Sequence, residues 1–211
     1  MLPNLYLITD RKQCSNLIDT IKMSLDGGLK LIQLREKDLS TKELFDLATE
    51  IKSLTDEYDA QLIINDRVDV ALAIEADGVH IGVGSLPIDK IKALSSNSKL
   101  KSHSSKFLIG YSAHSLKEAV EVEKHVDYIF FSPIFPTPSK MKYGNPQGLE
   151  KLKEVVAKIS IPVYALGGIK LSNLSDILET EVHGVALISE VIASSDPMKA
   201  TRNLIDLFAR R

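Results

Sequence analysis

The chain has 211 residues, 44% of them hydrophobic, which is enough to bury one sizeable core in a single domain covering 1–211. Its 26 basic and 28 acidic residues leave a net charge of −2 without a long run of one sign, so the sequence indicates neither a nucleic-acid-binding surface nor a polybasic membrane tether. The single cysteine, Cys14, excludes an intrachain disulfide and a cysteine-rich zinc site. The first residues lack a signal-peptide pattern and no apolar run approaches the ~20 residues of a membrane span, so we expect a cytoplasmic protein.

Short apolar runs without polar alternation recur along the chain and predict strands that are covered on both faces, as in parallel sheets. The runs begin at Leu5, Leu29, Ala60, Asp77, Phe107, Asp127, Ile161 and His183. Amphipathic helix patterns follow them at 17–25, 40–58, 68–74, 88–94, 116–124, 149–159, 171–178 and 197–209. Ser40 can cap the second of these helices, with Glu43 completing a capping box.

Eight strand-then-helix units predict an α/β fold, a single-domain (β/α)8 TIM barrel. An open, doubly wound sheet is the alternative, but eight regular units in so short a chain favour closure. In such barrels the chemistry lies on the loops that follow the C-terminal ends of the strands. Nearly every predicted strand here ends in polar groups that can bind anions or metals, which a purely structural barrel would not need.

Gln33, Arg35 and Lys37 alternate after the second predicted strand. If the strand persists, all three point into the barrel mouth while Glu36 faces the helices. Two cations and an amide in a mouth of low dielectric are costly without an anion, so a phosphate or diphosphate fits. The alternative is that Arg35 and Lys37 pair with Glu36, Asp38 or other nearby carboxylates.

Asn65 and Asp66 follow the third predicted strand and offer oxygen ligands that suit Mg2+. Either residue could instead cap the next helix. For Asn65 both interpretations stay open, and for Asp66 we favour the metal because an anion site is expected nearby.

Gly167 and Gly168 follow the seventh strand and Ser189 follows the eighth, which is the usual place of a phosphate cradle in this architecture. His80 and His114 lie on strand tails without metal-ligand spacing, so we interpret them as hydrogen-bonded structural residues. The sequence contains neither a nucleophile elbow nor a dinucleotide-binding glycine fingerprint, which disfavours acyl and hydride transfer.

Taken together, the strand tails resemble the thiamine phosphate synthase and thiazole tautomerase family. The resemblance covers almost the full chain and rests on "LYLITD", "QLREK", "NDRVDVALAIEADGVHIG", "IGYSAHSLKEA", "SPIFPTPSK", "ALGGI" and "GVALIS". The synthase branch of this family joins hydroxymethylpyrimidine diphosphate to a thiazole phosphate, giving thiamine phosphate and diphosphate. The resemblance therefore implies a transferase of thiamine biosynthesis with two small phosphorylated substrates, and it carries an expectation of self-association.

Carried over position by position, the resemblance implies a role for each strand tail. The residues expected to hold the pyrimidine diphosphate are Gln33, Arg35, Lys37 and Asn65, with Asp66 as the Mg2+ ligand. Those expected around the reacting region and the two phosphates are Ser112, Thr137, Ser139 and Lys140, and those expected to cradle the thiazole phosphate are Gly168, Ile188 and Ser189. We expect the departing charge to be stabilised by Mg2+ together with Arg35, Lys37 and Lys140.

Two positions decide between the branches. Ser85 stands where the synthase branch has an Asp as second metal ligand, and a Gly-Ser pair at this place is more similar to the tautomerase branch, which isomerises a thiazole carboxylate phosphate. Pro133 stands where the tautomerase branch has an acid/base histidine, as it does in the synthase branch. We place the synthase first; the alternatives are the tautomerase and a non-catalytic barrel that binds a thiamine precursor.

Overall fold

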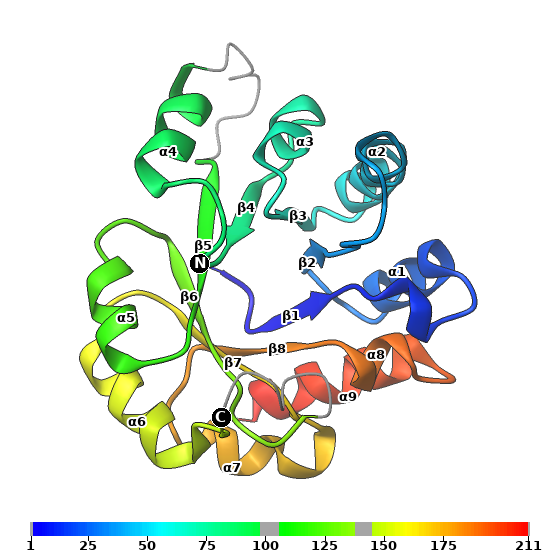
Figure 1. Ribbon diagram of the computed structural model, residues 1–211. Helices are drawn as coiled ribbons and strands as arrows, with labels where there is room; N and C mark the ends of the chain where they lie inside the picture. Colours follow the sequence, from blue (N-terminus) through cyan, green and yellow to red (C-terminus); the bar gives the residue numbers. More distant parts are fainter. Residues whose placement is uncertain (1, 98–105, 138–144, 211) are drawn as a thin grey trace.

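The computed structural model describes residues 2–97, 106–137 and 145–210. Its eight strands are all parallel and pair in chain order, and the ring closes where β1 (Leu5–Ile8) pairs with β8 (Gly184–Leu187). Figure 1 shows the helices arranged around the outside of this ring of strands. The predicted (β/α)8 barrel is therefore confirmed, and the open-sheet alternative is wrong.

The remaining strands lie close to the predicted apolar runs. They are β2 (Leu31–Leu34), β3 (Gln61–Asn65), β4 (Gly78–Ile81), β5 (Leu108–Ala113), β6 (Tyr128–Phe131) and β7 (Val163–Leu166). The longer helices are α1 (Leu17–Asp26), α2 (Thr41–Glu57), α3 (Val68–Ala73), α4 (Ile88–Asn97), α5 (Leu116–Val122), α6 (Gly148–Lys158) and α9 (Pro197–Ala209). No helix within the described ranges combines the length and the apolar character needed to cross a membrane.

Short helical segments modify the predicted pattern at three loops. A 3-10 turn, η1 (Arg11–Gln13), follows β1; the helix predicted at 171–178 divides into η3 (Leu171–Asn173) and α7 (Leu174–Leu178); and α8 (Ser189–Ile192) follows β8. The predicted capping box at the start of α2 is present, since Ser40 Oγ accepts from the Glu43 N–H while the Glu43 carboxylate accepts from the Ser40 N–H.

The core has two layers because the strands are covered on both faces. Aliphatic side chains fill the space between strands and helices, whereas the barrel interior holds the rings of Tyr6, Tyr128, Phe130 and Tyr164. Every pair among these four rings has centroids between 4.9 and 5.9 Å apart, in tilted or edge-to-face contact. Burial raises the pKa of Tyr6 and of Tyr128 well above the ordinary value, so both phenols stay neutral.

Gly110 on β5 makes room for this aromatic interior. It pairs with His80 on β4 and with Tyr128 on β6, and a Cβ at this position would lie 2.1 Å from Cζ of Tyr128. The Tyr128 ring therefore lies across the place where another residue would have its side chain.

We expect Gly110→Ala to lower the free energy of unfolding by about 1–3 kcal/mol, because the added methyl must displace a buried ring. Gly84→Ala is the matched control, since nothing lies within 4 Å of a Cβ built there. Urea unfolding of both variants tests this expectation, and equal stabilities would contradict the packing described for Tyr128.

Candidate active site

The tail of β2 carries the predicted anion-binding residues. Gln33 lies within the strand at 1% exposure, and its Nε2 has no hydrogen-bond partner in the described part of the chain. The strand ends at Leu34, so the expectation that it persists to Lys37 is wrong. Arg35 and Lys37 are nevertheless close enough that the positive charge of Arg35, together with partial desolvation, lowers the pKa of Lys37.

Glu36 is buried between the ends of β1 and β2. Its carboxylate accepts a 2.6 Å hydrogen bond from Thr9 Oγ1 and two bonds, of 3.1 and 3.2 Å, from the Arg11 N–H. The Arg11 guanidinium bridges Glu36 and Asp38, at 3.4 and 2.6 Å. Glu36 therefore faces the end of β1 rather than the helices, which differs from the strand-based expectation.

Glu36 and Asp38, the carboxylates next to Arg35 and Lys37 in the sequence, are thus occupied by other cations. Asp38 pairs with Arg11 and with Lys12, and the Arg11 hydrogen bond holds the pKa of this carboxyl well below its ordinary value. Within the described residues, neither Arg35 nor Lys37 forms an ion pair. The alternative is therefore wrong for Glu36 and Asp38, while among the other nearby carboxylates the charge of Asp66 acts on Lys37 without forming an ion pair.

Thr9 fixes the backbone at the beginning of the cationic tail. Its Oγ1 donates to Glu36 and accepts from the Arg35 N–H at 2.9 Å, and the side chain is fully buried. The Thr9 hydroxyl therefore links the Glu36 carboxylate to the backbone N–H of Arg35.

Asn65 and Asp66 line a pocket of about 240 Å³ that also contains Lys37 and Arg67. The helix-cap alternative for Asn65 and Asp66 is wrong, because α3 begins after Arg67 and no side chain caps it. The Arg67 guanidinium donates two hydrogen bonds to the two oxygens of the Asp69 carboxylate. The Asp66 carboxylate forms neither an ion pair nor a hydrogen bond within the described ranges, and its backbone is left-handed with φ 64°.

The oxygen atoms of this pocket supply only part of the coordination shell that Mg2+ needs. Asp66 supplies one unengaged carboxylate beside the cationic tail, which suits an ion that completes its shell with substrate phosphates and water. Ser85 Oγ accepts a 2.9 Å bond from the Gly82 N–H and so stabilises its own turn. Among the described residues there is no group of three or more His, Cys, Asp or Glu that could hold a metal without a substrate.

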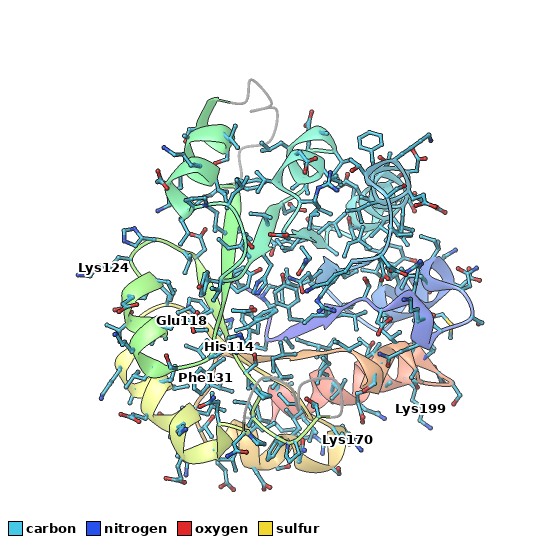
Figure 2. All side chains as sticks on the ribbon, viewed as in Figure 1. His114, Glu118, Lys124, Phe131, Lys170 and Lys199 are labelled. Carbon is cyan, nitrogen blue, oxygen red and sulfur yellow. The ribbon has the colours of Figure 1, made fainter. Side chains whose placement is uncertain are left out.

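The tail of β5 joins two histidines to neighbouring elements. Ser112 Oγ lies 2.8 Å from Nε2 of His80, while His114 Nδ1 donates to the Ser132 carbonyl at 2.8 Å. Glu118, in the first turn of α5, accepts from the His114 N–H and from the Tyr111 hydroxyl. Figure 2 labels His114 and Glu118 at this junction. Both histidines are hydrogen-bonded, as predicted.

Gly167 and Gly168 lie against the loop after β6. Both have left-handed backbones, with φ 104° and 67°, and a Cβ at Gly168 would lie 2.7 Å from Cβ of Phe135. The N–H groups of Ile134 and Phe135 donate to the carbonyls of Leu166 and Gly167. The glycine pair therefore has a packing reason in addition to the expected contact with a phosphate.

The other predicted residues divide by whether the structure describes them. Thr137 has a buried Oγ1 without a hydrogen-bond partner in the described part of the chain, whereas Ser139 and Lys140 lie outside the described residues. Ile188 directly precedes α8 and packs on both core layers, and Ser189 is the exposed first residue of α8.

A larger hollow of about 1240 Å³ lies at the opposite end, where the strands begin, and none of the predicted site residues line it. Its charges include the ion pairs Lys52–Asp56 and Lys106–Asp127. Lys52 and Lys106 are thus neutralised by carboxylates of the same hollow, which also contains Lys92 and Lys124.

Thr9, Glu36 and Glu118 were not identified as site residues from the sequence, although they hold the strand tails in place. Their partners are far away or on another element: Glu36 contacts Thr9 across 27 positions of sequence. The only available signal was their position in strand tails or a first helical turn.

We expect Thr9→Val to lower the free energy of unfolding by about 1–3 kcal/mol, because it removes a buried donor from Glu36 and an acceptor from the Arg35 N–H. Thr201→Val is the matched control: Thr201 is fully buried, but its hydroxyl has no partner in the described ranges. Urea unfolding should show the control unchanged or more stable, and a Thr9→Val protein as stable as the wild type would disprove the role of this hydroxyl.

Comparison with known proteins places the site in context. The model of a family described as thiamine monophosphate synthase matches residues 5–191. A thiamine-phosphate synthase of Desulfitobacterium hafniense is 41% identical over 97% of both chains, and a putative thiamine-phosphate synthase of Geobacter sulfurreducens is 43% identical over 99% of this chain and 95% of its own. The solved structure of a thiamine phosphate pyrophosphorylase from Pyrococcus furiosus has a TM-score of 0.87 and 38% identity, covering 98% of this chain and 96% of that one. The chain therefore belongs to the thiamine monophosphate synthase family.

Proposed function

We propose that the chain is a thiamine-phosphate synthase, a transferase that couples hydroxymethylpyrimidine diphosphate with thiazole phosphate to give thiamine phosphate and diphosphate. The names of the relatives at 41% and 43% identity confirm the predicted activity. The assignment of individual residues to substrates is our own and rests on the geometry at the barrel mouth.

One observation carries the proposal for the site. Glu36 and Asp38 are neutralised by Arg11 and Lys12, so the charges of Arg35 and Lys37 stay available for a ligand. The unpartnered amide of Gln33 lies on the same strand tail. A polyanion such as a diphosphate would satisfy all of these groups at once.

The reaction needs stabilisation of a departing anion more than it needs a base. The bond between the pyrimidine methylene carbon and the diphosphate oxygen breaks, and its electron pair goes to the diphosphate. The thiazole nitrogen then shares its lone pair with the cationic carbon. Arg35 and Lys37 would stabilise the negative charge that develops on the diphosphate, and Thr137, Gly168, Ile188 and Ser189 would orient the thiazole phosphate.

Mg2+ would be held by Asp66, with Asn65 at the same pocket, and when bound it supplies further positive charge for the leaving diphosphate. Ser139 and Lys140 are proposed to close over the phosphates on the strength of the resemblance. Pro133 at the place of the acid/base histidine favours coupling over tautomerisation. His114, whose Nδ1–H donates to the Ser132 carbonyl, does not discriminate, because the synthase branch often has a histidine at this position.

The purified protein should form thiamine phosphate and diphosphate from the two precursors and Mg2+. Chromatography of the products together with an enzymatic assay of released diphosphate measures this. Interconversion of thiazole tautomers without coupling would support the isomerase alternative, and binding without turnover would support a non-catalytic barrel.

We expect Arg35→Ala to lower kcat/KM for the pyrimidine diphosphate by about 100-fold or more, because a cation is lost where charge develops. Lys42→Ala is the matched control, because it also truncates a long cationic side chain, but one that is exposed on α2 and pairs with Asp46. Steady-state kinetics with both substrates tests the difference. A near-normal rate for Arg35→Ala would remove the β2 tail from the proposed site.

Ser85→Asp should lower the Mg2+ concentration needed for half-maximal rate, because an aspartate can keep the bond to the Gly82 N–H and add a charged oxygen. Ser85→Asn preserves size and hydrogen bonding without the charge and should leave the metal titration unchanged. If neither variant shifts the titration, Ser85 does not face the ion.

The cytoplasmic location and the self-association expected from the sequence stay predictions. Gel filtration with light scattering measures the second of these directly.

A further inference from the structure

Ser112 lies at one end of a chain of buried polar rings that crosses the barrel interior. Its Oγ is 2.8 Å from His80 Nε2, His80 Nδ1 is 3.3 Å from the Tyr128 hydroxyl, and that hydroxyl is 2.7 Å from the hydroxyl of Tyr6. His80 is 3% exposed and both tyrosines are fully buried, whereas Ser112 is half-buried. The coupling mechanism above uses none of these four residues, although the family resemblance places Ser112 at the reacting region.

The strand register makes this chain possible. His80, Gly110 and Tyr128 occupy paired positions on β4, β5 and β6, and the absent side chain of Gly110 lets the residues on either side of it meet. A Cβ at Gly110 would lie 2.4 Å from the Tyr128 hydroxyl oxygen. The His80 ring stacks on Phe130 at 4.0 Å, so its orientation is fixed on the face as well as at both nitrogens.

The direction of each hydrogen bond in this row of side chains follows from the number of protons that each group carries. Each hydroxyl and a neutral imidazole carry one proton. The Tyr6 hydroxyl has no hydrogen-bond partner in the described ranges other than Tyr128, so its proton is satisfied only if Tyr6 donates to Tyr128. Tyr128 must then donate its own proton to Nδ1 of His80, since any other order leaves a buried O–H without an acceptor. The imidazole proton is consequently on Nε2, which donates to Ser112 Oγ.

We propose that His80 is a positioning residue for the coupling reaction, an inference that rests on the synthase function: by donating from Nε2 to Ser112, it turns the Ser112 proton toward the barrel mouth and the leaving diphosphate. Ser112 keeps its proton throughout. As the electron pair of the breaking C–O bond passes to the diphosphate, this hydrogen bond strengthens, so it favours the transition state over the bound substrate. Tyr128 and Tyr6 hold the imidazole in the required tautomer.

The tautomer can be measured without any substrate. In protein labelled with ¹⁵N-histidine, long-range ¹H–¹⁵N spectra distinguish the two neutral forms, and loss of one signal set in His80→Gln assigns His80 among the five histidines. We expect the Nε2–H form in the wild type and loss of this preference in Tyr128→Phe. Tyr164→Phe is the control, because Tyr164 belongs to the same interior but donates to the Pro3 carbonyl. An Nδ1–H or doubly protonated ring in the wild type overturns the proposal, whatever the activity.

Kinetics tests the consequence for catalysis with a pair of amides. The amide nitrogen introduced by His80→Gln reaches the place of Nε2 and can still donate to Ser112, whereas that of His80→Asn reaches only the place of Nδ1. We expect His80→Asn to lower kcat by about 10- to 100-fold with little change in KM, and His80→Gln to restore most of the rate. Equal losses in the two variants would mean that the histidine only fills space.

A double variant separates positioning from general damage. If His80 acts through Ser112, then adding His80→Asn to Ser112→Ala should not lower kcat further. Multiplied losses would contradict the proposal. A wild-type protein that forms no thiamine phosphate would disprove the proposed function, while the spectra would still decide the tautomer.

Discussion

A buried carboxylate determines which charges are left over at the mouth of this barrel. Glu36 cannot be held at 5% exposure without donors, and the structure supplies them from Thr9 and Arg11 at the end of the first strand. Once Arg11 is committed to Glu36 and Asp38, the cations of the second strand tail form no ion pair among the described residues, and Asp66 is the carboxylate that still acts on Lys37. In the proposed site, a polyanion would therefore be attracted because a nearby negative charge is already satisfied and the positive charges are left without an ion pair.

The barrel interior must be packed tightly and its buried polar atoms must also be hydrogen-bonded. The interior of the barrel contains phenol and imidazole rings, whereas aliphatic side chains fill the layer between the strands and the helices. Each of these rings brings a polar atom that must be paired. The Tyr128 hydroxyl connects Tyr6 to His80, and the carbonyl of Pro3 accepts from Tyr164. The same residues thus pack the barrel interior and orient one another by hydrogen bonds. A substitution that changes the packing of one of these rings therefore also changes the hydrogen bonds.

Much of the architecture could be predicted from local patterns, because apolar runs and amphipathic spacings are properties of short segments. The capping box at Ser40 and the clustering of polar strand tails belong to this class. The partners of Glu36 could not be predicted, since they depend on how β1 and β2 meet, and the early end of β2 at Leu34 was missed for the same reason. Gly168 was interpreted through a ligand alone, whereas its approach to Phe135 becomes visible only when β6 and β7 lie side by side.

That approach has a consequence for the shape of the barrel wall beside the candidate site. Ile134 and Phe135 donate to the backbone of Leu166 and Gly167, so the sheet continues past the formal ends of β6 and β7. The wall beside the candidate site is therefore longer than the two strands alone. A side chain at Gly168 would have to displace Phe135 from this wall, so the glycine fixes how closely β7 and the residues after β6 can pack.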